Sequence, residues 1–288
     1  MTGNLSETGA LSESGIASRP ATALRGEDHD AGLHDVRAVV ESIEQSGVSI
    51  LRIGARLQAS AEDPAWSAAN VAFRLHLNAG GEEVSRIYTV RDTDGAGGFR
   101  FDVVLHEGSS PMMQWCAALR IGDVFGLTGP RPHMGIPETA GRKVALFLDE
   151  TGIPALYSLL MRWPQGVTGK GWVVTRDVAA FAELPRIAGL DLEHLQPDDT
   201  AQILLARARD LADAADRVVW AAGERREMRA IRQHFAALGV ARQDLAITGY
   251  WGRGLSNTQI DERRKADYEG VLARGGTLAD YDDLAVEI

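Results

Sequence analysis

The segment 86–91 carries side chains that could hold a flat cofactor with phosphate groups. In an extended strand, Arg86, Tyr88 and Val90 point to one face, whereas Thr89 and Arg91 point to the other. A guanidinium can bind a phosphate through two hydrogen bonds, a phenol ring can cover a heterocycle, and a hydroxyl can hydrogen-bond a ring nitrogen. Arg86, Tyr88 and Thr89 could therefore bind a flavin nucleotide. An exposed strand without a ligand is the alternative interpretation.

A second candidate site follows the next predicted strand. Ser110 is expected to cap a helix over residues 112–119, and the proline after it fits the first helical turn. Exposed amides at a helix start attract a pyrophosphate. A capped helix without a ligand is again the alternative. The other residues of interest here are His106, Ser109, Met112 and Trp115.

The elements that must position these residues differ between the two halves of the chain. Apolar residues at helical spacing predict a helix over residues 33–45. Short, partly alternating apolar segments separated by Gly- and Asp-rich turns then indicate a β-barrel or sandwich, which ends near residues 129–132. The predicted strands are 48–53, 71–77, 84–90, 99–105 and 124–127.

Beyond residue 141 strands and helices alternate, which predicts a parallel sheet covered on both faces. Such sheets bind ligands beyond the carboxyl ends of their strands, here near residues 149–152, 222–224 and 249–251. The predicted strands are 144–148, 172–175, 217–221 and 245–248, and the predicted helices are 152–163, 204–211 and 228–238.

Composition restricts the classes of protein to which the chain can belong. Its 288 residues are enough for two domains, and the net charge of −10 argues against nucleic acid as a partner. The single cysteine, Cys116, excludes an intrachain disulfide, and the seven histidines suggest no metal site. Residues 1–32 are expected to form a disordered tail without a secretory signal. We expect a cytoplasmic protein without membrane insertion, either a monomer or a weak dimer.

Taken together, the motifs resemble the siderophore-interacting protein family, FAD-binding ferric-siderophore reductases related to the ferredoxin reductases. The resemblance covers about residues 85–254, with each motif in family order. Its first half consists of Arg86-x-Tyr-Thr-Val-Arg, the His106 strand end, the turn before Trp115-x-Ala, Gly122-Asp and Gly129-Pro. Its second half consists of Asp149-Glu-Thr-Gly-Ile-Pro-Ala, Trp220-Ala-Ala-Gly-Glu and Tyr250-Trp.

The resemblance implies an N-terminal antiparallel FAD-binding β-barrel over residues 33–138 and a parallel-sheet NAD(P)H-binding-like α/β domain over residues 139–265, followed by a C-terminal segment, 266–288. It implies that Tyr88 and Thr89 lie at the reactive part of the flavin and act as catalytic residues. It also implies a cofactor-binding set: Arg86, Tyr88, Thr89, Val90, Arg91, His106, Ser109, Ser110, Met112, Trp115, Asp149, Glu150, Thr151, Pro154, Gly223, Glu224 and Trp251.

Some residues depart from the family pattern. Ser110 stands where the family usually has Gly, Gly152-Ile153 replaces Ala-Leu, and Gly252 separates Tyr-Trp from Arg253. The Gly-x-Gly-x-x-Gly fingerprint of dinucleotide-binding proteins is absent from the sequence. The related reductases do not require that fingerprint, so NADH and NADPH both stay open as donors.

The implied reaction passes electrons from NADH or NADPH through FAD to a ferric siderophore, which releases ferrous iron. FAD fits this task because it accepts two electrons and can release them singly. Local cations would help to attract an anionic ferric chelate, and Lys143, Arg253 and Lys265 are the candidates for siderophore binding. A generic flavin or ferric-chelate reductase and a non-catalytic siderophore- or nucleotide-binding protein are the alternatives.

Overall fold

The computed structural model describes residues 33–58, 63–79, 82–106, 108–198, 201–255 and 257–276, with the backbone alone at positions 79, 82, 83, 257, 258, 261 and 265. The tail predicted over residues 1–32 lies outside the described residues. No helix in these ranges has the length and hydropathy that are needed to span a membrane.

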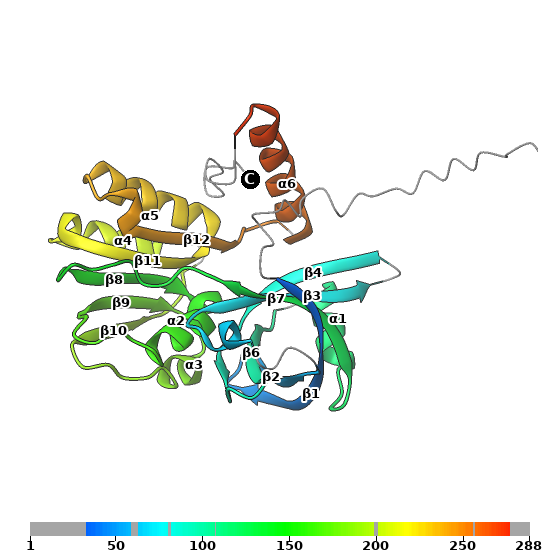
Figure 1. Cartoon of the computed structure of the whole chain (residues 1–288). Helices are drawn as coiled ribbons and strands as arrows, with labels where there is room; N and C mark the ends of the chain where they lie inside the picture. Colours follow the sequence, from blue (N-terminus) through cyan, green and yellow to red (C-terminus); the bar gives the residue numbers. More distant parts are fainter. Residues whose placement is uncertain are drawn as a thin grey trace, which may run out of the picture. The chain divides into compact units, whose positions relative to one another are not determined.

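Seven antiparallel strands make up the first sheet (Figure 1): β1 (His34–Ser46), β2 (Ile50–Leu57), β3 (Val71–Ala79), β4 (Glu82–Thr89), β5 (Asp92–Thr93), β6 (Gly98–Val104) and β7 (Val124–Pro132). Their order in the sheet is β4-β3-β7-β1-β2-β6-β5. Strand β4, at one edge, also contacts β6, which gives the sheet a barrel-like curvature. The predicted antiparallel barrel is confirmed.

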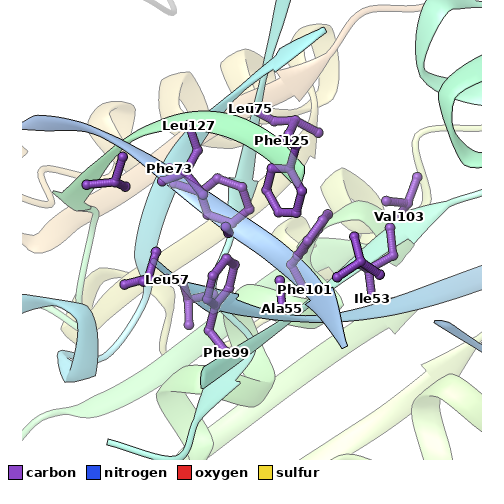
Figure 2. Close-up of a cluster of buried hydrophobic side chains, with 14 of the residues drawn as sticks. Ile53, Ala55, Leu57, Phe73, Leu75, Phe99, Phe101, Val103, Phe125 and Leu127 are labelled. Carbon is purple, nitrogen blue, oxygen red and sulfur yellow. The ribbon is translucent and has the colours of Figure 1, made fainter. Parts of the chain in front are cut away.

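Aromatic side chains on alternate positions of these strands form the core of the barrel (Figure 2). Phe73 packs edge-on against Phe99 and Phe101, with ring centroids 5.4 and 5.1 Å apart. Tyr88 of β4 lies 5.4 Å from Phe101, between centroids. Burial of each such side chain contributes about 1.5–3 kcal/mol, so the core holds β4 firmly in place.

The helix predicted over residues 33–45 is wrong, because this segment is strand β1. The helical spacing rests on Leu33, Val36, Val40 and Ile43 and does not include Ala38. The buried positions are Val36, Ala38 and Val40, which alternate with the period of a strand. Branched side chains such as valine also favour a strand over a helix. Strand β7 likewise continues to Pro132, beyond the predicted end at residue 127.

The second sheet is parallel, as predicted. Its strands are β8 (Lys143–Asp149), β9 (Gly169–Val174), β10 (Leu190–Leu195), β11 (Arg217–Glu224) and β12 (Leu245–Trp251), in the order β10-β9-β8-β11-β12. Every pairing in it is parallel. The short strand β10 was missed by the sequence analysis.

Helices cover both faces of the parallel sheet (Figure 1). Leu146 and Leu148 of β8 pack toward α2 (Ile153–Leu160) and α3 (Val178–Ala182). Phe147, which lies between them, points to the opposite face of the sheet. There it packs against Trp172 and residues of α4 (Ile203–Arg209) and α5 (Arg225–Ala237). This alternation explains why the strand is apolar throughout, since both of its faces are buried.

Two further helices border the sheets. Helix α1 (Pro111–Ala118) connects β6 to β7 and begins as predicted, because the Ser110 hydroxyl accepts a hydrogen bond from the Met113 amide at 3.3 Å. Helix α6 (Asn257–Ala273) follows β12 and was not predicted. Short 3-10 turns lie at Pro64–Ser67, Glu150–Gly152, Ala214–Asp216 and Arg242–Asp244.

Polar contacts connect the two sheets. The Asp177 carboxylate accepts hydrogen bonds from the amides of Val48 and Ser49 at 2.8 and 3.0 Å. The Asn70 amide donates to the Ser158 hydroxyl at 3.0 Å. Ile50 of the first sheet is fully buried in the core of the second. The domain boundary between residues 138 and 139 stays a prediction.

Candidate active site

A cavity of about 620 Å³ is lined by residues of both sheets. This volume lies within the range of about 300–1,000 Å³ that small-molecule sites commonly have. Strand β4, the start of α1, the carboxyl ends of β8 and β12, and helix α6 all contribute to it. Ten of the residues predicted from the sequence line this cavity: Arg86, Tyr88, Thr89, His106, Ser110, Met112, Glu150, Thr151, Pro154 and Trp251.

Strand β4 supplies a cation, an aromatic ring and a hydroxyl to the cavity. Arg86, Tyr88 and Thr89 all line it. The Arg86 guanidinium donates a hydrogen bond to the Ser85 carbonyl at 2.7 Å, which holds the side chain beside the strand. Burial raises the pKa of the Tyr88 phenol, so this side chain is neutral and suited to packing against a flat ring.

The start of α1 provides the second part of the cavity. Ser110 and Met112 line it, and the N-terminal end of the helix carries partial positive charge. Ser109 is exposed and is not among the lining residues, although its carbonyl accepts a hydrogen bond from Gln114 at 2.8 Å. Trp115 packs edge-on against Phe125 at 5.8 Å and does not line the cavity.

The carboxyl ends of β8, β11 and β12 meet beside the cavity. The Trp251 indole donates to the Asp149 carboxylate at 2.7 Å, and the Thr151 amide donates to the same carboxylate at 2.9 Å. Burial raises the pKa of Asp149 and outweighs these hydrogen bonds. A Cβ on Gly223 would lie 2.7 Å from an Asp149 oxygen, so glycine is required there. Asp149 therefore positions Trp251 from behind the cavity lining, and Gly223 leaves room for the Asp149 carboxylate.

Several predicted residues lie elsewhere. Val90 is buried in the barrel core. Lys143 begins β8, at the end opposite to Asp149, so it cannot contribute to a cationic rim at the carboxyl edge. Arg253 is exposed and outside the cavity lining, and its amide donates to Glu224 at 3.2 Å. The side chain of Lys265 lies outside the described residues.

Arg91 also has a different environment from the one predicted. Its guanidinium lies 3.1 Å from Asp102 and 2.8 Å from Glu183, and it covers the Tyr157 ring at 3.5 Å from the ring centroid. The side chain is almost fully buried and is absent from the cavity lining. The structure therefore places Arg91 between the sheets, where it compensates the two carboxylates, and outside the cavity lining.

His133, Tyr250 and Arg264 are among the lining residues that the sequence analysis missed. His133 is half-buried near Arg131 and Arg264, and burial together with these charges lowers its pKa to about 4. Arg264 of α6 donates to the Gly249 carbonyl at 3.1 Å. The Tyr250 hydroxyl is buried. The motif Tyr250-Trp251 in the sequence could have indicated that Tyr250, as the neighbour of Trp251, is also a site residue.

Comparison with known proteins decides the family. The family model described as "Siderophore-interacting FAD-binding domain" matches residues 58–134, and the one described as "Siderophore-interacting protein" matches residues 141–254. The chain is 33% identical over 268 residues to ferric acinetobactin reductase of Acinetobacter baumannii, which covers 91% of this chain and 93% of that protein. The chain belongs to the siderophore-interacting protein family. The resemblance inferred from the sequence motifs is confirmed.

Solved structures agree with this family assignment. The siderophore-interacting protein structure from Acinetobacter baumannii has a TM-score of 0.80 at 31% identity, covering 84% of this chain and 99% of that one. The ferredoxin reductase of carbazole 1,9a-dioxygenase has a TM-score of 0.62 at 16% identity and shares the fold, covering 76% of this chain and 69% of that one. This siderophore-interacting protein is thus built on the ferredoxin-reductase architecture.

FAD is the cofactor of this siderophore-interacting protein, and the cavity residues fit it. Arg86 and the start of α1 supply positive charge suited to phosphates, and Tyr88 supplies a ring suited to a heterocycle. Thr89 offers a hydroxyl, and the nearby buried Tyr250 hydroxyl has no hydrogen-bond partner of standard geometry among the described residues. Within the described ranges, no group of His, Cys, Asp and Glu side chains could hold a metal ion.

The helix starts at the carboxyl edge of the parallel sheet carry carboxylates. Glu224 caps α5 through the Glu227 amide at 3.0 Å, and Asp177 caps α3 through two amides at 3.1 Å. Glu227 accepts a hydrogen bond from the Leu205 amide of α4 at 3.1 Å. Carboxylates of the chain itself therefore occupy these two helix starts, where a phosphate could otherwise bind.

Proposed function

We propose that this protein is a cytoplasmic FAD-dependent reductase that transfers electrons from NADH or NADPH to a ferric siderophore and releases ferrous iron. The observation that carries the proposal is the cavity where Arg86, Tyr88, Thr89 and the start of α1 converge, in a chain with a matched FAD-binding domain. The related ferric acinetobactin reductase supports a ferric siderophore as the substrate class.

In this proposal each part of the cavity has a distinct task. Bound FAD supplies the conversion between two-electron and one-electron transfer. Arg86 and the amides before α1 hold its phosphates, Tyr88 covers its ring system, and Thr89 hydrogen-bonds its edge. Trp251, held by Asp149, encloses the cavity from the side of the second sheet.

The site for the iron chelate is proposed at the carboxyl edge of the second sheet. Arg253 and Lys265 are the cationic candidates retained from the sequence, and the cavity-lining Arg264 joins them. A local positive rim matters because the chain carries a net charge of −10 and would otherwise repel an anionic chelate.

The test is an anaerobic assay of the purified, FAD-loaded protein. NADH, NADPH and a reduced ferredoxin are each supplied as the donor, and bleaching of the flavin absorbance is followed before a ferric siderophore and a simple ferric chelate are added. Bleaching by a nicotinamide followed by faster reduction of the siderophore supports the proposal. Equal rates for both chelates would favour a generic ferric-chelate reductase. A protein that takes up no FAD would leave only a binding role.

A further inference from the structure

Two hydroxyl groups from different sheets lie beside each other at the cavity. Thr89 ends β4, Tyr250 lies in β12, and both residues line the cavity. The Tyr250 hydroxyl is adjacent to that of Thr89, yet it makes no hydrogen bond of standard geometry with any residue of the described ranges. An unpaired buried hydroxyl costs about 1–3 kcal/mol. Rotation of the two hydroxyls into a hydrogen bond is therefore favourable.

The Tyr250 ring is held in place from two sides. It packs against the His133 ring, with centroids 6.0 Å apart and planes tilted by 59°. The backbone at Gly249 is close to Arg225, because a Cβ at Gly249 would lie 2.4 Å from Cγ and 3.0 Å from Cα of that residue. Strand β12 is therefore packed closely against the start of α5 at Gly249, and the phenol of the next residue, Tyr250, lies beside Thr89.

The direction of the hydrogen bond follows from the chemistry of the two groups. Burial raises the pKa of the Tyr250 phenol and the Asp149 charge raises it further, so the phenol keeps its hydrogen at neutral pH. Each hydroxyl has one hydrogen to donate. A phenol is the more acidic of the two and hence the stronger donor. When Tyr250 donates to Thr89, the Thr89 hydrogen remains available to the ligand in the cavity.

We propose that Tyr250 is a positioning residue, whose hydroxyl donates to Oγ1 of Thr89 and thereby directs the Thr89 hydrogen at an acceptor atom of the bound flavin. The inference rests on the proposed function, in which Thr89 contacts the flavin edge. It adds a residue of the second sheet to the cofactor site on the first.

The first test uses the apoprotein and the variants Tyr250→Phe, Thr89→Val and their combination. The decrease in the thermal unfolding midpoint of the double variant should be smaller than the sum of the two single decreases by about 2 °C or more, because either single change removes the same hydrogen bond. Tyr157→Phe is the matched control, since it removes a phenol hydroxyl but keeps the ring that Arg91 covers at 3.5 Å. In the double variant Tyr157→Phe, Thr89→Val, the change in the unfolding midpoint should equal the sum of the two single changes.

The second test measures FAD affinity by fluorescence titration of each apoprotein. Tyr250→Phe and Thr89→Val should each weaken binding by about 2- to 10-fold, the equivalent of one hydrogen bond, and the double variant should lose little more. The flavin absorption band should show the same altered shape in all three. Tyr157→Phe should leave both the affinity and the band unchanged.

The outcomes separate the two proposals. Two results would overturn the positioning role. One is that the midpoint changes of the two single variants add up in the apoprotein. The other is that Tyr250→Phe binds FAD as the wild type does while Thr89→Val binds it more weakly. A wild-type protein that binds no FAD would overturn the proposed function, and the apoprotein cycle would still decide whether the hydroxyl pair exists.

Discussion

Arg86 and Arg91 have the same side chain but lie in different environments. Arg86 lies on the edge strand β4 and lines the cavity. Arg91 lies beyond the end of that strand, where the Asp102 and Glu183 carboxylates bind its guanidinium. Alternation along the strand puts Arg86 and Arg91 on opposite faces, but it could not show which of them faces the cavity, and Arg91 lies beyond the strand, which ends at Thr89. Of the two, Arg86 is the one that lines the cavity.

Replacement of Arg86 by alanine is expected to impair FAD binding. A hydrogen bond to a charged group contributes about 1.5–3 kcal/mol, which corresponds to a loss of affinity of roughly 10- to 100-fold. The measurement is FAD titration of the apoprotein. Arg74→Ala is the matched control, since Arg74 lies on the neighbouring strand β3, donates to the Ser85 hydroxyl at 2.9 Å and does not line the cavity. Equal losses in both variants would contradict a specific role for Arg86.

At the scale of elements, helix α1 depends on its cap. The Ser110 hydroxyl accepts from the Met113 amide, and its replacement by alanine should cost about 1 kcal/mol of stability. The same change should weaken FAD binding, since the helix start would fray beside the cavity. Urea unfolding and FAD titration measure the two effects. Ser109→Ala removes an exposed hydroxyl one residue earlier and should change neither; an effect as large as that of Ser110→Ala would argue against the cap.

Elements with strong local signals were predicted well. The Ser-Pro start of α1 and the uninterrupted apolar run of β8 each have one physical interpretation. Strand β1 was missed because Val36, Val40 and Ile43 have helical spacing, and a register shift between Val40 and Ser42 interrupts the alternation that is typical of a strand. Tyr250 was missed as a site residue because its importance comes from Thr89, which lies on a different sheet and is distant in sequence.

At the scale of the whole molecule, a buried cluster of charges joins the two sheets. Arg52 of β2 lies 2.8 Å from Asp102 and 2.7 Å from Glu183, and Arg91 contacts the same two carboxylates. Asp102 is fully buried and compensates both guanidinium groups. Removal of one partner from such a cluster leaves uncompensated buried charge, which is more costly than the loss of an exposed ion pair.

Asp102→Asn is therefore expected to destabilise the protein strongly. Loss of the shared carboxylate should cost about 3–5 kcal/mol, because two buried guanidinium groups lose their main partner. Glu41→Gln removes a carboxylate from an exposed pair with Arg56, 2.6 Å apart, and should cost about 1 kcal/mol or less. Urea unfolding of both variants provides the comparison, and similar losses would show that the cluster contributes no more than a surface pair.

The contact between Asp177 and the barrel is expected to depend on pH. The carboxylate accepts hydrogen bonds from the amides of Val48 and Ser49 and caps α3. Burial pushes the pKa of Asp177 upward, but the hydrogen bonds outweigh burial and hold the pKa below its ordinary value of 3.8. A lowered pKa in the folded state means that ionised Asp177 stabilises the fold above that ordinary value, and that this stabilisation is lost as the pH falls through the lowered pKa.

Asp177→Asn should consequently lower the free energy of unfolding most near neutral pH, and the difference from the wild type should shrink as the pH falls below about 4. Urea unfolding of both proteins from about pH 7 to about pH 3 measures this difference. Asp191→Asn is the control, because Asp191 is exposed and lies 3.9 Å from Lys170, so its replacement should change stability little at any pH. A difference between wild type and Asp177→Asn that stays constant or grows on acidification would show that ionisation of Asp177 does not stabilise this junction, because a stabilising carboxylate must lose its advantage when it is protonated.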